Sequence, residues 1–163
     1  MTETPHLTVR TGTLADLDEM MELAMMATEE NGFVAAVPQK LLYEIYPALI
    51  QDHGIVGIVG EPHGIIEGAV LLRIGTPWYS NESVLEEKAI FVHPDFRSAK
   101  GGRAARLCEF SKQVADTLGI PLTIGILSSS RTEAKVRMYR RLLGEPSGAY
   151  WLYGANTGMS ASH

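Results

Sequence analysis

A pair of glycines lies inside a short basic segment that links an apolar stretch to an amphipathic one. The apolar stretch ends at Val92, the glycines are Gly101 and Gly102, and the amphipathic stretch begins at Arg103. The first N–H groups of a helix lack intrahelical partners and lie at the positive end of its dipole. Glycine lets a ligand approach these groups closely. Four cations flank the junction: Arg97, Lys100, Arg103 and Arg106. The segment therefore predicts a phosphate-binding loop.

Other reactive residue types are too scattered to predict a metal site or a covalent nucleophile. The histidines show no ligand spacing with Cys108 or with the acidic residues, so we expect no metal. Cys108 falls within an expected helix, where a buried cysteine is a packing residue more often than a nucleophile. The glycine pair also lacks the Gly-x-x-x-x-Gly-Lys-Ser/Thr pattern of nucleoside triphosphate-binding loops.

The composition is that of one globular domain. The chain has 163 residues, of which 45% are hydrophobic and 20% charged, and its formal net charge is −5. The acidic balance argues against a general nucleic-acid coat. No apolar run is long enough to span a membrane. The first residues do not resemble a signal peptide, and the single cysteine forms no internal disulfide, so we expect a cytoplasmic protein.

Hydrophobic periodicity places the loop within a mixed α/β domain over residues 1–163, with a loose tail from about residue 155. We expect strands at 7–10, 55–60, 65–73, 84–92, 121–127 and 150–153 and helices at 13–31, 38–49, 103–118 and 130–144. Strands 84–92 and 121–127 are joined through a helix and should therefore be parallel. The expected architecture is a mixed sheet with parallel central strands, flanked by about four helices.

This order of elements and one extended motif resemble the acyl-CoA-dependent N-acetyltransferases of the GNAT superfamily, particularly the short type found in phages and prophages. The family motif is Val-x-Pro-x-x-Arg followed by Arg/Gln-x-x-Gly-x-Gly/Ala. Here it reads Val92, Pro94 and Arg97, with Gly102 as the last glycine. Lys100 occupies the place of the family's first glycine. Either the lysine contributes charge there, or the loop is reshaped and Gly101 takes the glycine's place.

A second stretch, from Ala134 to Gly144, resembles the family pattern Ala-x-x-x-Tyr-x-x-x-Gly and contains Tyr139. The resemblance implies a GNAT-like fold and acetyl-CoA as cofactor. It implies that the cofactor phosphates bind the loop amides and that the pantetheine arm lies along the strand before the loop. The implied cofactor-binding residues are Ile90, Phe91, Val92, Arg97, Ser98, Ala99, Lys100, Gly101, Gly102, Arg103 and Ala104.

The same resemblance gives the catalytic candidates their roles. Tyr139 would donate a proton to the departing thiolate. An amine must be neutral to attack, and Glu86 or Glu87 is the candidate acceptor of its proton, directly or through water. Neighbouring strand residues point to opposite faces, so only one of the two can serve, and comparison with the motif favours Glu86. His93 is a third candidate base. Solvent-facing strand positions for both glutamates, a turn role for His93 and a packing role for Tyr139 are the alternatives.

The expected function is transfer of an acetyl group from acetyl-CoA to a primary amine by direct attack in a ternary complex. The acceptor is a small molecule or a protein amine, and its class stays open. An aromatic group could shape its groove or could simply pack: Phe33, Tyr43, Tyr46, Trp78 and Tyr79. The alternatives are a non-catalytic CoA-binding or protein-interaction module of a phage or host, and a nucleic-acid binder that uses the basic helix start. The strand at 150–153 is a candidate homodimer contact.

Overall fold

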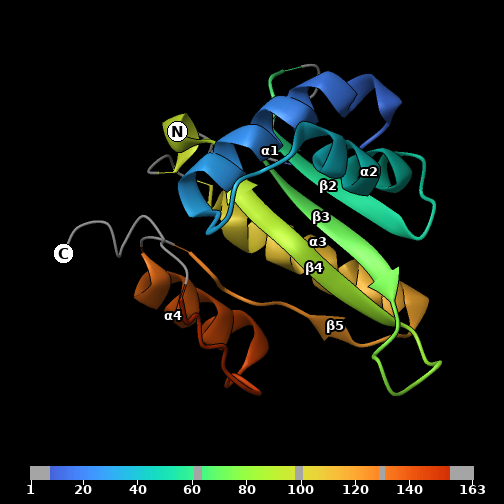
Figure 1. The fold of residues 1–163 in the computed structure, drawn as a ribbon, viewed down its shortest axis with the longest axis vertical. Coiled ribbons are helices and arrows are strands. Elements are labelled where there is room, and N and C mark those ends of the chain that lie inside the picture. Colours follow the sequence, from blue (N-terminus) through green and yellow to red (C-terminus); the bar gives the residue numbers. More distant parts are fainter. Residues whose placement is uncertain (1–7, 61–63, 98–100, 129–130, 155–163) are drawn as a thin grey trace, which may run out of the picture.

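The computed structural model describes residues 8–60, 64–97, 101–128 and 131–154, and Figure 1 colours its elements along the chain. One mixed sheet has the strand order β1-β2-β3-β4-β5. Its members are β1 (Thr8–Thr11), β2 (Gly54–Gly60), β3 (Gly68–Gly75), β4 (Val84–Val92) and β5 (Leu122–Thr123). The pairs from β1 to β4 are antiparallel, whereas β4 and β5 are parallel, as predicted from the helix between them.

Helices cover both faces of the sheet, so the molecule has three layers (Figure 1). α1 (Leu17–Asn31) and α2 (Pro38–Leu49) lie on one face, and α3 (Arg103–Leu118) lies on the other. α4 (Thr132–Leu143) lies on the β5 side of the sheet and packs against the middle of α3, where Lys112 Nζ donates to the carbonyl oxygen of Leu142 at 3.1 Å. Two short 3-10 turns, η1 (Leu14–Asp16) and η2 (Pro94–Phe96), precede α1 and follow β4. The mixed α/β architecture predicted from the sequence is confirmed.

The alternation of side chains along β2 divides the core into two clusters. Val56 and Ile58 pack with α1 and α2, whereas Val59 packs on the opposite face with Leu107 of α3. Gly57 lies on this second face, where a Cβ atom would come within 2.6 Å of the Phe110 ring. The sheet is therefore buried on both faces, and α3 lies directly against it.

Two predicted strands differ in the structure. The strand expected at 121–127 is paired only at Leu122–Thr123, because β4 and β5 separate beyond that point. Residues 144–154, which include the aromatic strand expected at 150–153, form neither helix nor strand. Tyr150, Trp151 and Tyr153 are almost fully exposed. Aromatic residues favour strands when they can pair with a neighbouring strand and pack on a sheet. Residues 150–153 do not pair with any described strand.

Candidate active site

The separation of β4 from β5 opens a pocket between the two strands. The two strands pair at Leu85↔Leu122 and Glu86↔Thr123, and then diverge. In the described strands, the edge of β4 from Glu87 to Val92 that faces β5 is consequently unpaired. A pocket of about 670 Å³ lies along it, between the end of α1, the start of α3 and the inner face of α4. An exposed strand edge of this kind can bind an extended ligand through main-chain hydrogen bonds.

Three predicted cofactor contacts on β4 line this pocket, namely Ile90, Phe91 and Val92. A β-bulge upstream of these residues determines whether Glu86 or Glu87 faces the pocket. Leu71 pairs with Ala89 and Leu72 pairs with Glu87, so Lys88 is an extra residue in β4. Glu87 lies in the pocket wall, whereas Glu86 is not among the described lining residues. Its carboxylate instead accepts a 2.8 Å hydrogen bond from Lys88 Nζ.

The environment of Glu87 suits a proton acceptor at neutral pH. Burial raises the pKa of its carboxyl from 4.5 to about 7, against the opposing effect of the Lys88 charge. A general base is most effective when its pKa lies near the working pH. The geometry therefore favours Glu87, whereas comparison with the motif favoured Glu86.

Tyr139 reaches the same pocket from α4. Burial raises the pKa of its phenol above the usual value of 10, and the neighbouring Glu87 and Cys108 act in the same direction. The phenol is thus protonated at neutral pH and able to donate. Cys108 is fully buried in α3, and burial raises the pKa of its thiol to about 11. A protonated, buried thiol is a poor nucleophile, so the site fits direct transfer without an enzyme thioester.

At the other end of the pocket, the start of α3 has the geometry expected of an anion-binding turn. Gly101 has a φ of 126° and Gly102 a φ of 57°, and Gly102 is the N-cap of α3. L-residues rarely adopt these values, so the turn requires glycine at this point. Gly102 and Ala104 line the pocket. Three predicted loop contacts, Ser98, Ala99 and Lys100, lie outside the described residues.

Arg97 is held by protein groups on two sides. Its Nε donates to the carbonyl oxygen of Val92 at 3.0 Å, and its Nη1 donates to Glu30 Oε1 at 2.6 Å. A second contact joins Nη2 to Glu30 Oε2, and the guanidinium carbon lies 4.9 Å from the centre of the Phe91 ring. Arg97 lines the pocket, but it also ties α1 to the end of β4. The nearby guanidinium holds the pKa of Glu30 below its usual range.

Arg103 lines the pocket, as expected of a cofactor contact, but its side chain is also engaged within the protein. Its side chain is 8% exposed and forms an ion pair with Glu67, and its Nε donates to Glu67 Oε1 at 2.7 Å. The guanidinium carbon also lies 5.1 Å from the centre of the Phe96 ring. Arg106 in turn donates to the carbonyl oxygen of Gly101 at 2.7 Å. The contacts of Arg103 and Arg106 therefore stabilise the conformation of the turn.

The remaining sequence candidates lie elsewhere. His93 accepts a 3.1 Å hydrogen bond from the Asp95 N–H, which matches the turn role considered for it, and it is not among the described lining residues. The aromatic group proposed for an acceptor groove does not line the pocket either. Trp78 is 96% exposed and packs edge-on against Tyr79, with their ring centroids 5.6 Å apart.

Several lining residues were missed from the sequence, above all Glu30, Arg131 and Lys135. Lys135 precedes Tyr139 by four residues, so helical spacing alone places both on one face of α4. Glu30 lies 67 residues before Arg97 and carries no local motif. Among the described residues, no cluster of three His, Cys, Asp or Glu side chains could hold a metal ion. None of the described helices is long and apolar enough to cross a membrane.

The five-stranded mixed sheet flanked by four helices matches the GNAT-like fold of solved acetyltransferases. No family model matches the sequence and no curated protein matches it significantly, so the likeness lies in the fold.

Three solved structures illustrate this likeness. The aminoglycoside N-acetyltransferase AAC(6')-Iy, solved with a bisubstrate analogue of CoA and acetylneamine, superposes with a TM-score of 0.68 at 18% identity, covering 91% of this chain and 97% of its own. A predicted acetyltransferase from Clostridium acetobutylicum, solved with acetyl-CoA, has a TM-score of 0.68 at 14% identity, covering 90% and 94%. An integron cassette protein from the mobile metagenome of a salt marsh has a TM-score of 0.68 at 23% identity, covering 88% and 87%.

Proposed function

We propose that this protein is an N-acetyltransferase that transfers an acetyl group from acetyl-CoA to a primary amine in a ternary complex. The observation that carries the proposal is the pocket along the unpaired edge of β4. It has an anion-binding turn at one end and two proton-transfer groups, Glu87 and Tyr139, in its walls. Solved proteins of the same fold bind CoA or acetyl-CoA.

The residues of the pocket fit acetyl-CoA in three respects. The start of α3 offers backbone N–H groups and the dipole end for a phosphate. The edge of β4 from Glu87 to Val92 offers main-chain donors and acceptors to an extended amide-containing arm. The basic side chains that line the pocket outnumber its acids, Glu30 and Glu87, as a polyanionic ligand requires.

The proposed chemistry follows from the two titratable groups. The bound cofactor supplies an activated acetyl carbonyl. Glu87 accepts a proton from the acceptor amine as its nitrogen bonds to the carbonyl carbon, directly or through water. When the carbon–sulfur bond breaks, Tyr139 donates its phenolic proton to the thiolate. Main-chain N–H groups of β4 polarise the carbonyl oxygen, and holding both reactants in one pocket makes the attack effectively unimolecular.

The proposal is tested by following the release of free CoA thiol from acetyl-CoA with a panel of amines. The panel contains polyamines, aminoglycosides and lysine-bearing peptides, and an alcohol series serves as control. Amine-dependent thiol release, with acetylated product detected by mass spectrometry, is the expected result. Saturable acetyl-CoA binding without transfer to any amine would instead favour the non-catalytic CoA-binding module.

A further inference from the structure

Three of the four cations predicted from the sequence to bind phosphate form hydrogen bonds with other groups of the protein. Arg97 is engaged by Glu30, Arg103 by Glu67 and Arg106 by the Gly101 carbonyl. Each of these contacts restricts the orientation of its guanidinium group. Among the described residues, cations of the pocket wall that are not held in this way belong to another element.

That element is α4, on the opposite wall from α1. Arg131 at its N-cap and Lys135 one turn later both line the pocket. Within the described part of the chain, neither forms a salt bridge. Arg131 also has a φ of 58°, a left-handed conformation that is costly for a side chain of its kind. The start of α4 thus presents two cations to the pocket.

In the pocket wall, Lys135 lies near one opposite charge, Glu30, and two like charges, Arg97 and Arg131. Partial burial lowers the pKa of its ammonium, and the like charges of Arg97 and Arg131 act in the same direction, against Glu30. Crowding cations at a half-buried position is unfavourable, and an anion bound between them would remove the penalty. A dianionic phosphate is a strong partner for such a pair because each hydrogen bond is charge-assisted.

We propose that Arg131 and Lys135 on α4 form a second phosphate-binding element, which recognises a phosphate of the cofactor across the pocket from the glycine turn of α3. This inference rests on the proposed function, because it assigns residues to the cofactor of that reaction. The phosphate end of the cofactor would then be held between two helices, by backbone N–H groups of α3 on one side and side-chain cations of α4 on the other. We call this arrangement the clamp.

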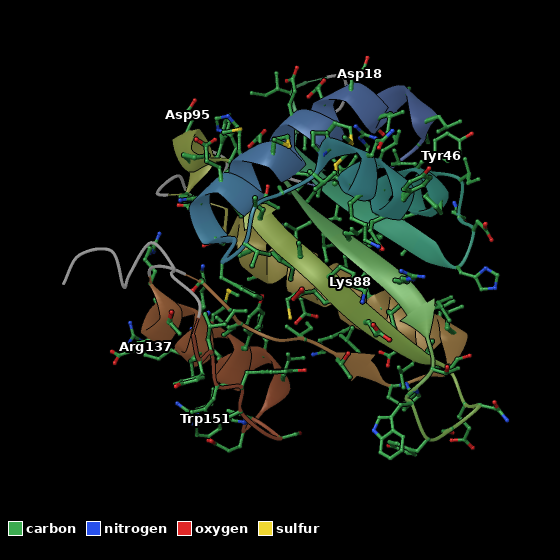
Figure 2. All side chains as sticks on the ribbon, viewed as in Figure 1. Asp18, Tyr46, Lys88, Asp95, Arg137 and Trp151 are labelled. Carbon is green, nitrogen blue, oxygen red and sulfur yellow. The ribbon has the colours of Figure 1, made fainter. Side chains whose placement is uncertain are left out.

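The experiment is calorimetric titration of four proteins with CoA and with 3′-dephospho-CoA. Lys135→Met keeps the length of the side chain without its charge. Arg131→Asn introduces a residue that tolerates a positive φ and an N-cap position, so helix α4 keeps its start. Arg137→Gln is the matched control, because Arg137 is an exposed arginine of the same helix that Figure 2 shows on the side facing away from the sheet.

We expect Lys135→Met and Arg131→Asn each to weaken CoA binding roughly tenfold or more, the effect of losing one charge-assisted hydrogen bond. The control should bind like the unchanged protein. A loss seen with CoA but not with 3′-dephospho-CoA assigns the clamp to the 3′-phosphate, whereas an equal loss with both assigns it to the diphosphate. CoA binding unaltered by either α4 variant would overturn the clamp while leaving the proposed function intact. Failure of the unchanged protein to bind CoA would instead remove the proposed function itself.

Discussion

At the scale of single residues, the proposed chemistry depends on two side chains whose proton affinities are set by burial. Glu87 has a pKa of about 7, and the pKa of Tyr139 is raised above its usual value. At neutral pH a large share of Glu87 is ionised while Tyr139 stays protonated. The pair is consequently ready to accept a proton from an amine and to give one to a thiolate.

Replacing Glu87 tests its assignment as the group that accepts a proton from the amine. We expect Glu87→Gln to lower kcat/KM for the amine roughly 100-fold, the smaller end of the effect of a general base. In the unchanged protein, activity should rise with pH through a midpoint near the Glu87 pKa of about 7, because only the carboxylate accepts a proton. This midpoint should vanish from the pH profile of the variant.

Glu86→Gln is the matched control for Glu87→Gln, because Glu86 is the adjacent carboxylate and pairs with Lys88. Its pH–rate profile should keep the midpoint. A profile that loses the midpoint in Glu86→Gln but retains it in Glu87→Gln would identify Glu86 as the base.

Tyr139→Phe tests the assignment of Tyr139 as the proton donor to the thiolate. Removing the hydroxyl should lower kcat roughly tenfold to 100-fold and leave the dissociation constant of acetyl-CoA nearly unchanged, because the acid acts when the thiolate leaves. Steady-state kinetics together with calorimetric titration separate the two quantities. Equal turnover in the two proteins would make Tyr139 a packing residue of the pocket wall.

At the scale of elements, the turn before α3 is the feature on which the proposed cofactor binding depends. Gly102 begins α3 and Gly119 ends it, and both have positive φ angles, 57° and 69°. A Cβ at Gly102 would lie 3.9 Å from Ala105 Cβ, and one at Gly119 would meet nothing within 4 Å. The two positions are thus alike in backbone strain and in free space, and differ in that Gly102 lines the pocket.

Gly102→Ala and Gly119→Ala should therefore lose similar stability, about 1 kcal/mol for an L-residue held in the left-handed region. We expect only Gly102→Ala to weaken acetyl-CoA binding, by roughly tenfold, because its methyl group covers the amides that face the phosphate. Urea denaturation gives the first quantity and calorimetry the second. Equal cofactor affinity in both variants would argue against phosphate binding at this turn.

The ion pair behind the turn makes a separate prediction about stability. Arg103 and Glu67 are both 8% exposed, so losing one partner leaves a charge buried. Arg103→Met should cost about 3–5 kcal/mol of unfolding free energy. Combining it with Glu67→Gln should recover part of that loss, because no buried charge remains. Urea midpoints that are the same for the single and double variants would show that the pair contributes through packing alone.

At the scale of the whole molecule, most elements follow from local patterns. The strand Val84–Val92 and the helix Arg103–Leu118 have the bounds that hydrophobic periodicity predicts, and Gly119 ends the helix as expected. These features depend on residues close together in the chain. For the same reason, the parallel pairing of β4 and β5 could be predicted from the helix between them.

The details of the site depend on contacts that no local pattern contains. Glu30 meets Arg97 across 67 positions, and Glu67 meets Arg103 across 36. These contacts decide which arginine side chains are engaged by protein groups, and the charge count of the loop does not reveal them. The choice of Glu87 over Glu86 depends on a bulge whose partner strand is β3. The short β5 and the unpaired segment at 150–153 likewise reflect where neighbouring strands end.

We propose above all that the pocket between β4 and α4 binds acetyl-CoA. Its most direct test is a calorimetric titration of the unchanged protein with acetyl-CoA, with adenosine 3′,5′-bisphosphate as a probe of the phosphate end. We expect saturable binding of acetyl-CoA in the micromolar range, about 8 kcal/mol, and weaker competitive binding of the bisphosphate. No heat of binding with either ligand, from a protein shown to be folded by circular dichroism, would contradict it.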